Sequence, residues 1–234
     1  MKTMRTLIVA LLLMLSMSVA VAEDGFTVTM PNDLSTVKPG DFVTFGTYEQ
    51  DGNLNNGSEP LEWIVLDVVD GRAMLITNYC IDARAYHVDF IPMTWEHCTL
   101  RKWLNSEFID IAFSAEEQTV IPTVTIQNPG NQFYGTPGGN ATDDRVFLLS
   151  HDEAMEFFKE DSLRQGIPTP YAVERGAYYE EELNRTWWWL RTAGVRSIDA
   201  CGVRVNGRIS GYGSRDVYRP SGALRPVIWV EMGK

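Results

Sequence analysis

The stretch Asn184–Gly194 reads NRTWWWLRTAG and contains three consecutive tryptophans. In an extended strand, Trp187 and Trp189 share one face with Arg191, while Trp188 points to the other face. Both faces are then apolar, which is typical of a strand covered on both sides, and each buried indole contributes roughly a few kcal/mol. We expect Trp187 and Trp189 in the core. For Trp188 two alternatives stay open, a core position and a partly exposed ligand contact.

Further strands are expected at both ends of the chain. The alternating segment Phe42–Thr47 predicts one strand, and Leu61–Asn78 predicts two strands joined at Asp70-Gly71, a strong hairpin signal. After the tryptophans, the chain reads as a run of strands to its end. Val205–Arg208 contains Asn-Gly and predicts a type I′ hairpin turn.

Helices are expected between these two groups of strands. Apolar residues from Leu100 to Ile111 fall on one helical face, and Thr94 is the expected N-cap. Capping boxes predict two more helices, and a fourth is expected around Tyr171–Tyr179. The boxes are Ser114 with Glu117 and Ser150 with Glu153. Residues 127–144 form a long polar loop, a kind of segment that is often functional.

Strands and helices are therefore grouped rather than alternating. This grouping predicts an α+β fold with a mostly antiparallel sheet, a few helices and long loops. We expect a lead-in over residues 23–37 and a single globular domain over residues 38–234.

The N-terminus predicts export. Lys2 and Arg5 precede an apolar run that ends at Ala20-Val21-Ala22, so residues 1–22 are interpreted as a signal peptide, with an uncleaved anchor as the alternative. We expect a secreted protein, extracellular or periplasmic, without membrane attachment after cleavage. Cleavage removes two cations and changes the net charge from −11 to −13. Such an acidic chain repels phosphate backbones, so no nucleic acid partner is expected.

The three cysteines, Cys80, Cys98 and Cys201, are too few for a disulfide scaffold. A Cys80–Cys98 bridge with one thiol left over and three buried free thiols are both compatible with the sequence. A low count in an exported protein indicates a core large enough to need no cross-links.

The search for catalytic motifs gives no candidate. The sequence contains no HExxH, GxSxG, P-loop or CxxC motif. His151-Asp152 opens a helix and is explained by capping, and His97-Cys98 is an isolated pair. We therefore expect no catalytic residue, no metal and no cofactor.

Two arginines follow apolar segments and require partners. A buried arginine needs a carboxylate or backbone carbonyls, because an unpaired buried charge is very costly. The two are Arg191 and Arg225, and Asp199 is a candidate partner for them. A structural ion pair is preferred over substrate binding.

Aromatic residues, arginine and asparagine in Gly-rich loops predict the binding surface, because these residue types suit recognition. One part is the segment Tyr134–Asn140 in the long loop, and the other is Tyr212–Tyr218. The candidate ligand-binding residues are Tyr134, Asn140, Trp188, Tyr212, Arg215 and Tyr218. Ordinary exposed loop composition is the alternative.

Seven segments occur in a fixed order: GDFVTFGTYEQD, EWIVLDV, LRKWLN, FSAEE, VFLLS, WWWLRT and LRPVIWV. This order resembles a bacterial family of exported and surface proteins known only as a domain of unknown function. The resemblance covers about Lys38 to Val230 and places Leu100–Asn105, Trp187–Arg191 and Arg225–Trp229 in family motifs. It implies no catalytic residue.

The end of the chain is also similar to the C-type-lectin-like fold, including its formylglycine-generating enzyme branch. That resemblance implies joined N- and C-terminal strands, two helices and a displayed loop. The chain departs from it at two places. Glu59-Pro60 is followed by Leu61 instead of completing a lectin calcium motif, and only Cys201 lies late in the chain. Calcium-dependent sugar binding and oxidase activity are therefore not expected.

The sequence thus favours non-catalytic recognition of an extracellular or cell-surface ligand, a glycan or a protein. An extracellular enzyme of unrecognised type and a structural part of a surface assembly are the alternatives. A deep pocket with convergent acid and base groups would favour the enzyme, and a shallow aromatic groove would favour binding.

Overall fold

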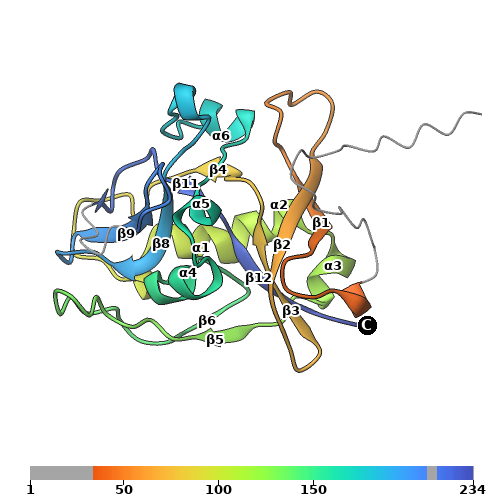
Figure 1. Cartoon of the computed structure of the whole chain (residues 1–234), viewed down its shortest axis with the longest axis horizontal. Coiled ribbons are helices and arrows are strands. Elements are labelled where there is room, and N and C mark those ends of the chain that lie inside the picture. The colour runs from red at the N-terminus through yellow and green to blue at the C-terminus, as the bar shows by residue number, and fades with distance from the viewer. Residues whose placement is uncertain (1–33, 210–214, 234) are drawn as a thin grey trace, which may run out of the picture.

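The computed structural model describes residues 34–209 and 215–233 (Figure 1). The expected signal peptide, most of the lead-in and Tyr212 lie outside these ranges. No helix within them combines the length and the apolar character needed to cross a bilayer.

The first sheet joins the beginning and the end of the described chain. Its strand order is β1-β2-β3-β12-β7, and every neighbouring pair is antiparallel. Its strands are β1 (Phe42–Tyr48), β2 (Glu59–Val69), β3 (Arg72–Thr77), β12 (Val227–Glu231) and β7 (Val146–Phe147). The predicted hairpin is confirmed, because Asp70 and Gly71 both have positive φ between β2 and β3.

The second sheet has the order β10-β9-β8-β11-β4. A single parallel bridge, Ala223 to Trp188, joins β11 to β8, and the other pairs are antiparallel. Its strands are β4 (Asp82–Ala83), β8 (Trp188–Ala193), β9 (Asp199–Val203), β10 (Arg215–Asp216) and β11 (Ala223–Leu224). A separate pair consists of β5 (Val124–Ile126) and β6 (Thr142–Asp144).

The helical segments are short. They are η1 (Leu34–Thr36), η2 (Trp95–His97), α1 (Thr99–Trp103), η3 (Leu104–Phe108), α2 (Ile109–Ala112), α3 (Ala115–Thr119), α4 (His151–Phe157), α5 (Asp161–Arg164), α6 (Pro170–Glu174) and η4 (Glu181–Leu183). In Figure 1, β8 and β9 lie on the left, β1 and β2 lie on the right, and α1 lies between them. The predicted α+β class with mostly antiparallel sheets is confirmed.

The helix expected from Leu100 to Ile111 is broken by a wide turn. The segment η3 is π-helical, and it separates α1 from α2. A π turn holds an extra residue and rotates the face that follows it. Ile109 therefore points inward, while Ile111, which was expected to be buried, is 57% exposed. Thr94 makes no side-chain cap, and Cys98 Sγ caps α1 instead by accepting from Arg101 N.

Both predicted capping boxes are present, at Ser114 with Glu117 and at Ser150 with Glu153. The fourth helix is shorter than expected. It ends at Glu174, and Thr169 caps it by accepting from Ala172 N. Its proline at the first turn suits a helix start, because proline lacks the N–H that would be unpaired there.

The tryptophans of β8 form the centre of the core. Trp188 is 0% exposed, and its Nε1 donates to the Arg164 carbonyl at 2.9 Å. The alternative of a partly exposed Trp188 that contacts ligand is therefore wrong. A Cβ on Gly166 would lie 2.8 Å from Trp188 Cδ1, so the close approach of the ring requires glycine there. Trp187 and Trp189 are also buried, as expected.

The buried arginines have the kinds of partner that the sequence required, but Asp199 is not one of them. Arg191 pairs with Glu153, with Nη2 to Oε1 at 2.6 Å, and it donates to the Leu148 and Gln127 carbonyls. The suggested partner, Asp199, instead binds Arg196. One turn also differs. Of the central Asn-Gly pair in residues 205–208, only Gly207 has positive φ, whereas a type I′ turn needs both.

Arg225 is fully buried, and its Nε donates to the Thr77 carbonyl at 3.0 Å. Its guanidinium lies 5.1 Å from the centre of the Trp188 ring and 5.5 Å from that of Phe158. A carbonyl and aromatic faces therefore replace the carboxylate that a buried cation usually has.

Candidate binding site

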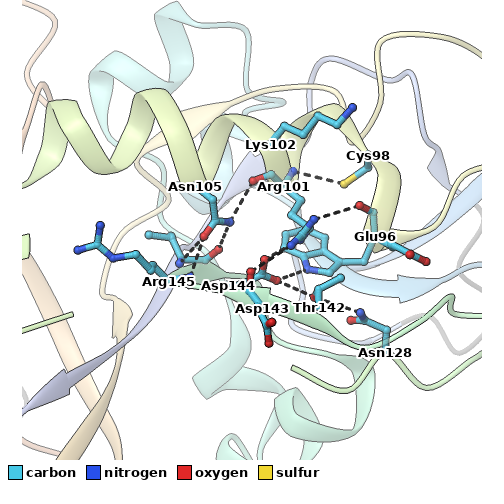
Figure 2. A network of polar contacts seen from close by, with 12 residues as sticks. Glu96, Cys98, Arg101, Lys102, Asn105, Asn128, Thr142, Asp143, Asp144 and Arg145 are labelled. Atoms are coloured by element: carbon cyan, nitrogen blue, oxygen red, sulfur yellow. Dashed lines mark hydrogen bonds and ion pairs between the residues drawn. The ribbon is translucent and has the colours of Figure 1, made fainter. Parts of the chain in front are cut away.

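The helix that contains LRKWLN is fixed to β6 and β7 by two polar side chains (Figure 2). Arg101 Nε donates to Asp144 Oδ1 at 2.6 Å, and its other nitrogens donate to the carbonyls of Glu96 and Asp143. Asn105 Nδ2 donates to the Val146 carbonyl at 2.7 Å. One turn apart on the helix, these side chains hold α1 and η3 in one position.

Asp144 lies at the centre of this network and is 1% exposed. Besides Arg101, its carboxylate accepts from Trp95 Nε1 at 2.9 Å and from Thr142 Oγ1 at 2.8 Å. A buried carboxylate with this many donors is fully satisfied. These contacts assign Asp144 a structural role, because they join η2, α1 and β6.

The end of the long loop is joined to η2. Asn140 donates to the Glu96 carboxylate from its backbone N and from Nδ2, each at 3.1 Å. These hydrogen bonds lower the pKa of Glu96, because they stabilise the charged form. Asn140 thus closes a loop, and its side chain is occupied by this contact.

A groove of about 370 Å³ lies between the chain after β4 and the helix α1. This volume falls in the range of small-ligand pockets, which is roughly 300–1,000 Å³. Its lining includes Arg84, Ala85, Val88, Thr99, Lys102 and Trp103. Ser106 and Glu107 complete the helical side.

Trp103 and Arg84 are stacked in this groove. The Arg84 Cζ atom lies 3.8 Å from the Trp103 ring centroid, a cation–π contact. Arg84 Nε also faces Asp82 Oδ2 at 3.4 Å. Asp82 is 1% exposed and is held in turn by the Tyr48 hydroxyl, which donates at 2.9 Å. The guanidinium is therefore oriented by a ring below it and a carboxylate beside it.

An exposed apolar patch continues the groove. Val88 belongs to the groove lining and precedes Phe90 and Ile91, which are exposed. Phe90 meets Tyr218 edge to face, with ring centroids 4.9 Å apart. We call Val88, Phe90, Ile91 and Tyr218 the aromatic patch. Tyr218 is thus one predicted residue that lies on a candidate surface.

The remaining predicted residues are not gathered with Tyr218. Arg215 stacks on Trp187 at 4.4 Å and pairs with Ala200 in the sheet. Ala200 is followed in β9 by Cys201. The loop that carries Tyr134 packs over Cys201 through Asn131. Neighbouring strand residues point to opposite faces, so Arg215 and this loop lie on opposite sides of the second sheet. Tyr134 itself is 41% exposed at the loop tip.

A second, smaller pocket of about 50 Å³ lies between this loop and α4. His151, Asp152 and Cys201 all line it, and His151 Nδ1 lies 2.8 Å from Asp152 Oδ1. Burial raises the pKa of the Cys201 thiol to about 12, because the thiolate is poorly solvated there. The thiol is therefore protonated at neutral pH and is a poor nucleophile.

The cysteines are free and buried in the described structure. Of the two alternatives, the structure therefore supports three free thiols and not a Cys80–Cys98 bridge. Within residues 34–209 and 215–233, one group of side chains could bring three metal-ligating atoms within 4.8 Å of one another. It consists of Glu49, Asp51 and Glu59, whose carboxylates accept from backbone N–H groups of the same loop.

Sequence reasoning missed Arg84, Lys102 and Trp103 as site residues. A signal for them was present, since Thr99, Lys102, Trp103 and Ser106 follow helical spacing and share one side. That side carries polar residues around a single tryptophan. The interpretation of Trp103 as one more core residue hid this pattern.

Comparison with known families matches residues 70–232 to the family described as "Domain of unknown function (DUF6273)". The chain belongs to the DUF6273 family. The matched DUF6273 region contains the helix with Arg101 and Asn105, the strand β8 and the strand β12, and it begins after β1 and β2. Neither a curated protein nor a solved structure matches the chain.

Proposed function

We propose that this protein is a secreted, non-catalytic recognition domain that binds an extracellular or cell-surface ligand, a glycan or a protein. The observation that carries the proposal is the groove of about 370 Å³ with its stacked Arg84 and Trp103, which runs into the aromatic patch. Oriented polar groups beside exposed aromatic rings are the usual composition of a binding surface.

We further propose a C-type-lectin-like architecture. Two features support it: the first sheet pairs early strands with the last strand, and the segment between β5 and β6 is a long loop. The sequence of residues 1–22 supports export, and the acidic charge of the chain argues against a nucleic acid partner.

The enzyme alternative receives less support from the geometry. It would require acid and base groups that converge in a deep pocket. The pocket with His151 and Asp152 measures only about 50 Å³, and its thiol is protonated at neutral pH. The larger groove beside exposed aromatic rings suits recognition better.

An array of extracellular glycans and matrix proteins, probed with the protein expressed with its own N-terminus, tests the proposal. We expect a ligand whose binding survives EDTA and weakens at least tenfold in Phe90→Ala and in Tyr218→Ala. Tyr179→Ala is the matched control, because Tyr179 is comparably exposed and lies outside the groove and the patch. Absence of any hit, or equal loss in the control, would contradict the proposal.

A further inference from the structure

The groove contains cationic groups whose donors are unused. Arg84 makes its hydrogen bond through Nε alone, so within the described residues its two outer nitrogens have no partner. The Lys102 ammonium, exposed one helical turn from Ser106, also has none there. The groove therefore offers donors and positive charge that the protein itself does not use.

The Arg84 guanidinium is preorganised for a planar anion. The Trp103 ring fixes the plane of the guanidinium, and Asp82 binds its Nε atom. The two outer nitrogens, Nη1 and Nη2, stay available as a pair of donors. An arginine fork matches the two oxygens of a carboxylate, and a preoriented side chain loses less entropy on binding.

The rest of the groove matches sugar hydroxyls. Thr99 supplies a hydroxyl group at this hollow, and Glu107 supplies an acceptor. The Ser106 hydroxyl donates to the Lys102 carbonyl and can accept from a sugar hydroxyl. A uronic acid presents one carboxylate together with several hydroxyl donors, so it uses both kinds of group. An acidic peptide side chain carries the carboxylate alone and has no hydroxyl donor for Glu107.

We propose that this groove binds a uronic acid residue of an acidic glycan, with its carboxylate on Arg84 and Lys102. This inference rests on the proposed recognition function and names its ligand class. The chain has a net charge of −11, but charges are screened over about 8 Å at physiological ionic strength. The groups in the groove therefore decide binding, and the distant acidic surface contributes little.

Calorimetric titration with trigalacturonate tests the inference on the protein expressed with its own N-terminus. We expect saturable binding that weakens at least tenfold in Arg84→Gln and severalfold in Lys102→Gln. Arg84→Lys should also bind less tightly, because an ammonium keeps the charge but lacks the fork. Lys159→Gln removes the same charge from an exposed position outside the groove and should bind like the unaltered protein.

Two comparison ligands identify the chemistry. The methyl ester of trigalacturonate lacks the charge and should bind at least tenfold more weakly, and triglutamate should do the same. Equal binding of the ester, equal binding of the peptide, or no effect of Lys102→Gln and Arg84→Gln would overturn the inference. Lys102 is exposed, so its variant remains informative if Arg84→Gln does not fold.

The two proposals fail separately. If the array yields a ligand that depends on Phe90 and Tyr218 while trigalacturonate does not bind, the recognition function stands and the uronic acid inference is wrong. If trigalacturonate binds with the same affinity to Arg84→Gln, Lys102→Gln and the unaltered protein, the assignment of the groove is wrong.

Discussion

At the residue scale, the tryptophan triplet is a packing device. Strand alternation correctly predicted that both faces of β8 are apolar, and all three rings are buried. The sequence could not decide the position of Trp188, because the groups that cover it come from Gly166 and Arg225, which lie far away along the chain. The same limit applies to Arg191, whose partner Glu153 stands in a capping box that looked complete by itself.

Trp188→Phe should lower the free energy of unfolding by about 2–3 kcal/mol, measured by urea denaturation. The smaller ring leaves a cavity, and the Arg164 carbonyl loses its donor. Trp229→Phe is the matched control and should cost less than about 1 kcal/mol, because Trp229 is only partly buried. Equal losses in the two variants would contradict the central position of Trp188.

Glu153→Gln should destabilise the protein by about 2–4 kcal/mol, because glutamine still caps α4 but leaves the buried Arg191 without its counter-charge. Glu117→Gln changes the equivalent position of the other capping box, where no arginine of the described residues pairs with the glutamate, and should cost less than about 1 kcal/mol. Thermal and urea unfolding of the two variants measure the difference. A similar loss in both would assign the effect to capping alone.

At the scale of elements, the sequence predicted where helices begin better than how they continue. Capping boxes are local and were confirmed at Ser114 and Ser150. The π turn at Leu104–Phe108 has no local signal. It contains Asn105, which is anchored to the backbone of β7, a strand that lies far away along the chain. The groove was missed for a related reason, because its second wall is the chain after β4, which only the tertiary fold brings to α1.

The contact between Asn140 and Glu96 should make the loop sensitive to acid. The pKa of Glu96 is lowered in the folded state, chiefly by Asn140, so this contact stabilises the protein above the ordinary glutamate pKa of about 4.3. The stabilisation is lost as the pH falls through the lowered pKa, when the carboxyl becomes protonated. An NMR titration should show a lowered value for Glu96 that rises towards the ordinary one in Asn140→Ala. An unchanged value in that variant would contradict this cause.

At the scale of the whole molecule, the grouping of strands and helices predicted the fold class, and turn chemistry predicted the first hairpin. The division into two sheets was not predictable, because it depends on short pairings such as the single bridge between Ala223 and Trp188. Such a bridge leaves no periodic pattern in the sequence. The predicted binding residues lie on different faces of the molecule for a similar reason. Their positions along the loops did not specify which face of the sheet each loop covers.

The thiols report on the integrity of the whole core. Cys80, Cys98 and Cys201 are buried, and burial raises each thiol pKa to about 12. At pH 8 the folded protein should therefore react with none of its three thiols on a scale of minutes, and it should release three equivalents in a thiol assay after denaturation. A single equivalent from the denatured protein would instead indicate a disulfide.

The place of β12 in the first sheet has a consequence for synthesis. This strand comes after every other strand that the structure describes, yet it lies inside the sheet, hydrogen-bonded to β3 on one side and β7 on the other. While the ribosome is still making residues 227–231, the emerging chain has two open sheet edges and cannot close its core. The early strands β1, β2 and β3 must therefore wait for residues 227–231 before the first sheet is complete. If the chain is exported while it is being made, as the proposed secretion would allow, its early strands would cross the membrane before the first sheet is complete.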